Sequence, residues 1–192
     1  MRELWDWCLK KNITLTPLLV PSAQDQADYL TRKIDKGDYT LNMDLFNLLK
    51  KENSPWINPD WDMFASQGNK KFQNYVTRYP FWECKKTDSL QCPLQDIKEC
   101  YANPPWTVID QWLIRLKEHP HLSCWLIVPF WASMSWWPLL AKMQVPGSPA
   151  IIIDPFQGMF KNCLEEDMPP PQGGPSSPLY YHANFGGKEN FS

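Results

Sequence analysis

The chain has 192 residues, among them 11 tryptophans and 19 prolines, and its formal net charge is −2. Its 8 glycines exclude collagen-like and Pro-Gly low-complexity chains, and an aromatic content of 14% with so little net charge excludes a wholly disordered chain. Because 19 basic side chains stand against 21 acidic ones, the chain has no positive excess for a simple polyanion binder.

The length suits one domain of ordinary size with additional pieces at its ends, and residues 1–52 are predicted to be the first such piece. Residues 3–10 place apolar side chains at helical spacing, and residues 13–16 alternate as a strand does. Ser22 can cap a following helix over residues 23–33. This part is therefore expected to be a helical and strand-containing N-terminal remnant.

A further helix is predicted to begin after Asn42, which can cap it, and Phe46 lies on its apolar side. Residues 53–60 then carry the turn-forming residues Asn, Ser, Pro and Asp. We interpret this segment as the linker to the next domain.

Residues 61–164 are predicted to form an α/β domain, because strand-like and helix-like segments alternate along them. The predicted elements, in chain order, are strands over 61–65, 75–79 and 100–102, a helix over 109–116, a strand over 124–128, a helix over 136–142 and a strand over 150–153. The runs at 124–128 and 150–153 are continuously apolar, which is typical of parallel strands buried on both faces.

The helix over 109–116 is the clearest of these, because its apolar residues follow the i, i+3, i+4, i+7 pattern. Thr107 and Asp110 are spaced to form its capping box. The 20 residues 122–141 carry no charge and have the length of a membrane span. However, Pro129 and Pro138 interrupt them, so a buried strand and a helix are expected instead.

Residues 165–192 lose all periodicity and contain a run of prolines and paired glycines, so they are predicted to be a disordered tail. The 6 cysteines form no Cys-x-x-Cys pair, and with 3 histidines no zinc-ligand spacing appears. We therefore expect no metal site and reduced thiols. The charged N-terminal residues do not form a signal peptide, so an intracellular location, nuclear or cytoplasmic, is expected.

The motif Asn103-Pro104-Pro105-Trp106 lies between a predicted strand and a predicted helix. The amine of a nucleobase is a poor nucleophile, because its lone pair is delocalised into the ring. The side-chain oxygen of Asn103 and the carbonyl of Pro104, held rigid by Pro105, can accept its two N–H bonds and direct the lone pair outward. Trp106 can stack on a base extruded from a duplex. The alternative interpretation is a rigid loop with no chemical role.

The segment 61–143 resembles the phage-type DNA adenine methyltransferases. In that family an Asp-x-x-Ala-Ser strand end, an Asn, a Tyr, an acidic residue, Asn-Pro-Pro-aromatic and paired Trp follow one another. The corresponding residues here are Asp62-Met63-Phe64-Ala65-Ser66, Asn69, Tyr75, Asp88, Asn103-Pro104-Pro105-Trp106 and, after the apolar run 126–129, Trp136-Trp137. The resemblance implies a partial Rossmann-like methyltransferase sheet and S-adenosylmethionine as the cofactor.

By this resemblance Asn103, Pro104, Pro105 and Trp106 are the candidate catalytic residues. The candidate donor-binding residues are Asp62, Phe64, Ala65 and Asp88. The chain differs from a usual donor site in lacking a glycine-rich turn, because the loop after residue 65 contains the single glycine Gly68. Lys70, Lys71 and Arg78, interleaved with aromatic residues, are candidate nucleic-acid contacts, with a solvated surface as the alternative.

The first part of the chain resembles the last helix, strand and helix of a retroelement ribonuclease H, in Trp5-Asp6-Trp7-Cys8, Ile13-Thr14-Leu15 and Ala27-Asp28-Tyr29-Leu30. Asp28 corresponds to the final acidic residue of that active site. One carboxylate cannot position the two metal ions of that reaction, so no nuclease activity is expected. Together the two resemblances are similar to the end of a DIRS-type retrotransposon polyprotein.

Two functions follow as hypotheses. The first is transfer of a methyl group from S-adenosylmethionine to the exocyclic amine of adenine in DNA. The second is a catalytically inactive retroelement fragment that acts as a nucleic-acid-binding module. The expected partner in both is DNA or an RNA–DNA hybrid of the element, with no membrane, and the oligomeric state is left open.

Overall fold

In a computed structural model, the chain forms two compact units, residues 1–35 and residues 36–192. The residues that the structure describes are 7–8, 10–14, 39–80, 84–148, 151–154, 156–162, 166–168 and, for the backbone alone, 180–186. In the first unit Trp7, Cys8 and Lys10 are helical, which agrees with the predicted helix, whereas Ile13 and Thr14 are not in a strand. Asp28 and the predicted helix around it lie outside the described residues.

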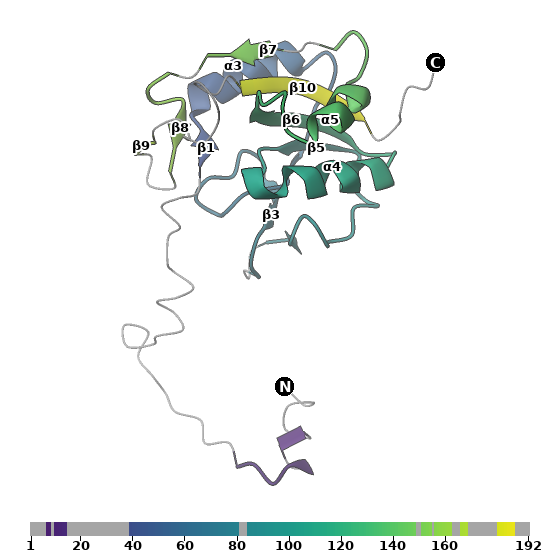
Figure 1. Ribbon diagram of the computed structural model, residues 1–192. Helices are drawn as coiled ribbons and strands as arrows, with labels where there is room; N and C mark the ends of the chain where they lie inside the picture. Colours follow the sequence, from purple (N-terminus) through teal and green to yellow (C-terminus); the bar gives the residue numbers. More distant parts are fainter. Residues whose placement is uncertain are drawn as a thin grey trace. The chain divides into compact units, whose positions relative to one another are not determined.

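The second unit is built on a seven-stranded sheet with the order β4-β3-β2-β5-β6-β10-β7 (Figure 1). Strands β2 to β6 all run parallel to one another, whereas β10 runs antiparallel to both β6 and β7. The strands are β2 (Trp61–Asp62), β3 (Asn74–Thr77), β4 (Lys86–Thr87), β5 (Glu99–Ala102), β6 (Ser123–Pro129), β7 (Ile151–Ile153) and β10 (Tyr180–Gly186).

The parallel part of the sheet has the strand order of a doubly wound fold. Numbered along the chain from β2, its strands lie in the order 3-2-1-4-5, so the direction of winding reverses between β2 and β5. The α/β prediction is therefore confirmed, and each predicted strand from 61 to 153 overlaps an observed one.

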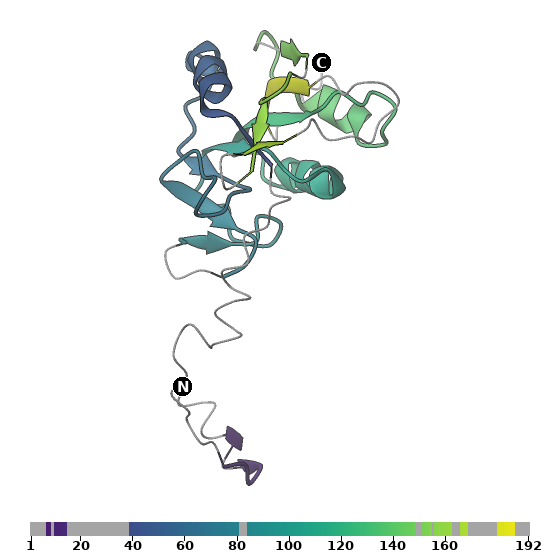
Figure 2. The same cartoon turned by 90° about the vertical axis from the view of Figure 1, so that its left-hand side faces the viewer.

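Helices cover both faces of this sheet. Helix α3 (Met43–Asn53) lies on one face, and α4 (Ile109–Glu118) and α5 (Trp137–Met143) lie on the other (Figure 2). The α3 face buries Phe46 and Leu49 against Tyr101 and Trp125 of β5 and β6. The N-cap role predicted for Asn42 is confirmed, because its side-chain oxygen accepts the N–H of Leu45 at 2.8 Å.

The packing of α3 changes the predicted domain organisation. We placed the boundary at residues 53–60, but the compact second unit begins at residue 36 and includes both α3 and this segment. The segment does turn, as its residues indicate, but the turn leads back onto the same core, where Ile57 is buried beside Phe46. The segment 36–52 thus belongs with the sheet and not with an N-terminal piece.

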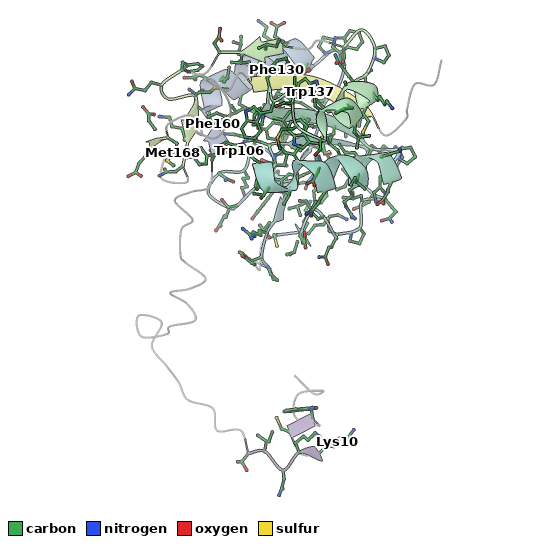
Figure 3. All side chains as sticks on the ribbon, viewed as in Figure 1. Lys10, Trp106, Phe130, Trp137, Phe160 and Met168 are labelled. Atoms are coloured by element: carbon green, nitrogen blue, oxygen red, sulfur yellow. The ribbon has the colours of Figure 1, made fainter. Side chains whose placement is uncertain are left out.

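A small second sheet extends the α3 side, in the order β1-β8-β9 (β1 Thr40–Leu41, β8 Phe160–Lys161, β9 Asp167–Met168). Phe160 and Met168, labelled in Figure 3, lie on β8 and β9 and pack on the α3 core. Asn42 joins this sheet to α3, because its side-chain amide donates to the Gly158 carbonyl at 2.9 Å. None of these two-residue strands was predicted.

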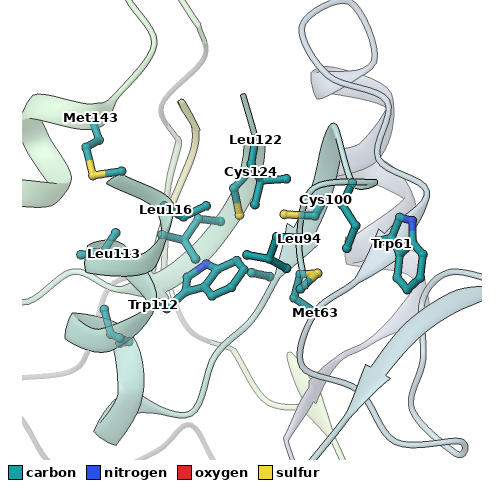
Figure 4. Close-up of a cluster of buried hydrophobic side chains, with 14 of the residues drawn as sticks. Trp61, Met63, Leu94, Cys100, Trp112, Leu113, Leu116, Leu122, Cys124 and Met143 are labelled. Atoms are coloured by element: carbon teal, nitrogen blue, oxygen red, sulfur yellow. The ribbon is translucent and has the colours of Figure 1, made fainter. Parts of the chain in front are cut away.

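The opposite face is filled by one apolar cluster around Trp112, which is fully buried (Figure 4). The four residues that predicted helix α4 are all buried in this cluster, as the 3.6-residue period requires: Ile109, Trp112, Leu113 and Leu116. The predicted capping box does not form. Residues 106–108 make a 3₁₀ turn that puts Val108 at the N-cap, and Asp110 accepts the N–H of Gln111 instead.

The predicted disordered tail over 165–192 is wrong for residues 180–186. This segment forms β10, which pairs with β6 along its whole length and with β7 at residues 180–182. The prolines before this segment favoured the prediction of disorder, whereas the strand forms by pairing with residues far away in the sequence. As a result β7, which we expected to be buried on both faces, lies at the sheet edge with Ile152 about half exposed.

The uncharged segment 122–141 becomes strand β6, a loop and the start of α5, as predicted. Within the described part of the chain, no helix has the length and apolar character needed to cross a membrane.

Candidate functional site

The candidate site lies at the carboxyl edge of the parallel strands. In open α/β sheets, ligands bind at this edge where the strand order reverses, which here is between β2 and β5. Asp62 ends β2, and the predicted motif follows β5 directly. The topology thus brings the predicted donor and acceptor residues to one edge: Asp62, Phe64 and Ala65 at β2, Asp88 after β4, and Asn103, Pro104, Pro105 and Trp106 after β5.

The carboxylate of Asp62 is buried and holds the loop that follows β2. One of its oxygens accepts the N–H of Phe64 at 3.3 Å, and the other accepts the N–H of Lys71 at 3.0 Å. Hydrogen bonds from backbone N–H groups to a carboxylate are charge-assisted and stronger than neutral ones. Asp62 therefore holds both ends of the loop at β2. It therefore acts on the site through the loop rather than as an exposed charge.

The same loop is held from within by Asn69, which is also buried. Its side-chain oxygen accepts the N–H of Ser66 at 2.7 Å, and its carbonyl accepts the hydroxyl of Thr40 at 3.4 Å. This loop has the single glycine Gly68 where a usual donor site has a glycine-rich turn. Asp62 and Asn69 supply side-chain hydrogen bonds that shape the turn.

The two other donor-side candidates pack inward. The ring of Phe64 meets Trp112 edge to face, with centroids 5.2 Å apart, and is partly buried. Ala65 is buried and donates its N–H to Val76 of β3 at 3.2 Å. At this edge Phe64 therefore packs against helix α4, and Ala65 is bonded to strand β3.

Asp88 shapes the third loop at this edge. Its backbone has φ 59°, its N–H donates to Thr77 of β3 at 2.8 Å, and its carboxylate accepts the N–H of Leu90 at 3.0 Å. Asp tolerates this left-handed conformation better than most residues. The next residue, Ser89, is buried and donates its hydroxyl to the carbonyl of Met63. The loop after β4 is thereby bonded to the end of β3 and to the loop after β2.

In the motif after β5, Pro104 is buried, Pro105 is exposed, and Asn103 is partly exposed. Pro105 is extended (φ −53°, ψ 141°), and its carbonyl accepts the N–H of Val108 at 3.0 Å, which starts the 3₁₀ turn. Among the described residues, neither the side-chain amide of Asn103 nor the carbonyl of Pro104 takes part in a hydrogen bond. Two neighbouring acceptors thus remain available at the point where the winding reverses.

An aromatic residue of the loop after β6 contacts this motif, and further aromatic rings of the same segment contact one another. Trp106 meets Trp131 nearly edge to face, with centroids 5.2 Å apart and planes at 73°. Phe130 meets Trp137 of α5 in the same way at 4.8 Å, and both residues are labelled in Figure 3. Trp136 is buried in the core and contacts Trp137 at 5.8 Å.

Each of the three candidate nucleic-acid contacts, Lys70, Lys71 and Arg78, already has a partner within the chain. Lys71 donates its ammonium to the Leu41 carbonyl at 2.6 Å and is bonded into the fold. Lys70 lies over the ring of Tyr75 at 4.5 Å, and the exposed Arg78 lies over the ring of Tyr79 at 5.3 Å. Each cation thus contacts an aromatic ring of its own chain or a carbonyl.

Two buried groups beneath the edge are held in their neutral forms. Burial raises the pKa of the Tyr101 phenol well above its ordinary value, and the Asp62 charge adds to the shift. Burial likewise raises the pKa of the Cys100 thiol, which faces Cys124 on the next strand (Figure 4). Neither group is placed to act as a base. No cluster of three or more possible metal ligands occurs among the described residues.

Sequence reasoning missed Ser89 as a part of this edge and did not foresee the contact of Trp131 with Trp106. Trp131 follows the end of the strand predicted over 124–128 by three residues, which is a positional signal that it lies at the same edge as the motif. The position of Ser89, beside Asp88, carried no such signal, because β4 has only two residues and no periodicity.

The sequence matches no family model and no curated protein.

Proposed function

We propose that this protein transfers a methyl group from S-adenosylmethionine to the exocyclic amine of adenine in DNA. The sheet supports this proposal, because its parallel strands have the doubly wound order with a binding edge between β2 and β5. With the reversed strand β10 between β6 and β7, the whole order resembles that of a Rossmann-like methyltransferase sheet. We propose further that the chain derives from the end of a DIRS-type retrotransposon polyprotein.

One observation carries the proposal. The Asn103 side chain and the Pro104 carbonyl stand next to each other at the reversal point, and neither is hydrogen-bonded within the described residues. Two acceptors fixed in this way can take both N–H bonds of an amine. This favours a pyramidal nitrogen whose lone pair points away from the protein, and such bonds strengthen as the nitrogen becomes tetrahedral.

Trp106 completes the acceptor side. Its backbone begins the 3₁₀ turn, which places its side chain next to the two acceptors on the same short segment. A large aromatic ring beside an amine-binding pair suits a base that has left the stack, because stacking offsets part of the cost of unstacking.

For the donor, the residues present fit in part. The cofactor supplies the methyl group, carried on a positively charged sulfur. The carboxylate of Asp88 is partly buried, and one of its two oxygens accepts the N–H of Leu90. The other oxygen is the acidic acceptor that we assign to a hydrogen bond from the cofactor. Asp62 fixes the loop after β2, and Phe64 packs inward against Trp112.

The second candidate function is a nucleic-acid-binding module without catalysis. The observation that favours it is the engagement of both Asp62 oxygens by backbone N–H groups, in a loop whose single glycine is Gly68. A protein that no longer binds the methyl donor would keep the fold and the aromatic residues Trp106 and Trp131 beside the motif. It would bind DNA with an affinity that falls as salt rises, and it would not bind the cofactor.

The two functions are separated by donor binding to the purified full-length chain, measured by isothermal titration calorimetry. We expect saturable binding of S-adenosylmethionine by the native protein and by the Asn103→Ala variant alike. Methyl transfer to adenine-containing DNA should fall about a hundredfold in Asn103→Ala, the scale of losing one transition-state hydrogen bond.

The matched control is Asn47→Ala, an exposed asparagine on helix α3, which should transfer methyl groups at the native rate. Donor binding without any effect of Asn103→Ala on transfer would remove the proposed role of the motif. No donor binding by a folded native chain would favour the second function.

A further inference from the structure

The loop that joins β6 to α5 carries Trp131 to the acceptor motif. Its backbone folds as consecutive tight turns, in which Trp131 donates to Pro129 at 2.9 Å, Met134 donates to Trp131 at 3.0 Å and Trp137 donates to Met134 at 3.0 Å. At its far end the buried Trp136 anchors the loop in the core. Trp131 is thus carried on a short loop with both ends fixed.

The neighbouring strand places this loop next to Trp106. Strands β5 and β6 are paired parallel, with Ala102 opposite Leu126, so the segments that follow them leave the sheet at the same edge. The rings of Trp106 and Trp131 meet with centroids 5.2 Å apart and planes at 73°. This near edge-to-face geometry is a favoured aromatic contact.

No polar bond competes with this ring contact on the Trp131 side. The indole N–H of Trp131 is buried and has no hydrogen-bond acceptor among the described residues. Buried tryptophans usually pair this group, so the orientation of Trp131 is set by packing. Trp106 in turn belongs to a single 3₁₀ turn with no side-chain cap, and its partly buried side chain packs at the margin of the core cluster.

We infer that Trp131 is a positioning residue that fixes the ring plane of Trp106 for stacking on the acceptor base. This inference rests on the proposed function. It assigns Trp131 no contact with the reacting atoms: its effect passes through Trp106. Losing the contact should therefore weaken base stacking and leave donor binding unchanged.

The test uses the full-length chain and single-stranded DNA in which one 2-aminopurine replaces adenine, because stacking of this base quenches its fluorescence. The affinity and the quenching are measured for the native protein and for Trp131→Ala, Trp131→Phe, Trp106→Ala and the double variant Trp106→Ala/Trp131→Ala. We expect Trp131→Ala to weaken DNA affinity about fivefold and to reduce quenching, as the strength of one aromatic pair predicts.

Three readouts distinguish positioning from a merely structural role. Trp131→Phe should restore most of the quenching, because phenylalanine can keep the edge-to-face contact. Adding Trp131→Ala to Trp106→Ala should have no further effect, since the two residues act as one unit. S-adenosylmethionine affinity should stay within about twofold in all variants. The half-exposed Trp7 of the first unit provides the control substitution Trp7→Ala, expected to change nothing.

Equal quenching by native protein and Trp131→Ala would overturn the inference, as would a full effect of Trp131→Ala in the Trp106→Ala background. Both outcomes leave the proposed function standing. Failure of the native protein to bind the donor would instead refute the proposed function, and with it the base-positioning role assigned here.

Discussion

Replacing Phe46 with alanine tests the assignment of helix α3 to the same compact unit as the seven-stranded sheet. Its side chain is 2% exposed and stacks on Trp125 with centroids 5.2 Å apart and planes at 24°. It also meets Tyr101 at 5.3 Å and Phe72 at 5.7 Å, both edge to face. Truncating a buried phenylalanine costs about 3–5 kcal/mol, and the three ring contacts place this site toward the upper end.

Such a loss is a third or more of the free energy of unfolding of an ordinary domain, which is about 5–15 kcal/mol. Urea unfolding followed by tryptophan fluorescence reports it, since the buried Trp125 and Trp112 lie on the two faces of the sheet. Leu48→Ala on the same helix is the control, because Leu48 is 58% exposed and should change stability by no more than about 0.5 kcal/mol. A loss below about 1 kcal/mol in Phe46→Ala would show that α3 does not stabilise the sheet.

Two other substitutions and one deletion follow from the described contacts. Tyr101→Phe should raise the free energy of unfolding by about 1 kcal/mol, because the buried hydroxyl has no hydrogen-bond partner among the described residues; a loss of stability would contradict this. Asn42→Ala should lower it by about 1–2 kcal/mol, through loss of the α3 cap and of the bond to Gly158, and an unchanged urea midpoint would refute both roles. Deleting residues 180–192 should abolish cooperative unfolding and cause association, because β6 and β7 lose their shared partner; a monomeric, cooperatively unfolding product by size exclusion and urea titration would refute the place of β10.

The elements that the sequence predicted are those in which local pattern and tertiary position agree. Helix α4 was predicted from four residues at helical spacing, and all four are buried. Strand β6 was predicted from a continuous apolar run, and it lies inside the sheet with both faces covered. In both cases the order of apolar side chains along the segment matches the side chains that are buried in the structure.

The elements that were missed depend on partners far away along the chain. Strands β1, β4, β8 and β9 have two residues each, too few for any period, and β10 follows a proline-rich segment that resembles a linker. The domain boundary failed for a related reason. Turn residues show where a chain bends, but they do not show whether it returns to the same core, as Ile57 does.

For the site, the sequence named candidate residues that follow β2, β4 and β5, and the parallel topology brings the ends of these strands to one edge of the sheet. It could not show which side chains are already engaged. Asp62 and Lys71 carry charges that suggest ligand contacts, yet both are bonded within the fold, whereas Asn103 is not. Local sequence contains the residue types of a site, and tertiary contacts decide which of them remain available.

The most direct test of the central claim is mass-spectrometric detection of N6-methyladenine in single-stranded DNA after incubation with the purified full-length chain and S-adenosylmethionine. We expect N6-methyladenine to accumulate with the native protein and with Asn47→Ala, and to fall about a hundredfold with Asn103→Ala. The absence of N6-methyladenine with a folded native chain at saturating cofactor would contradict the proposed transfer to adenine.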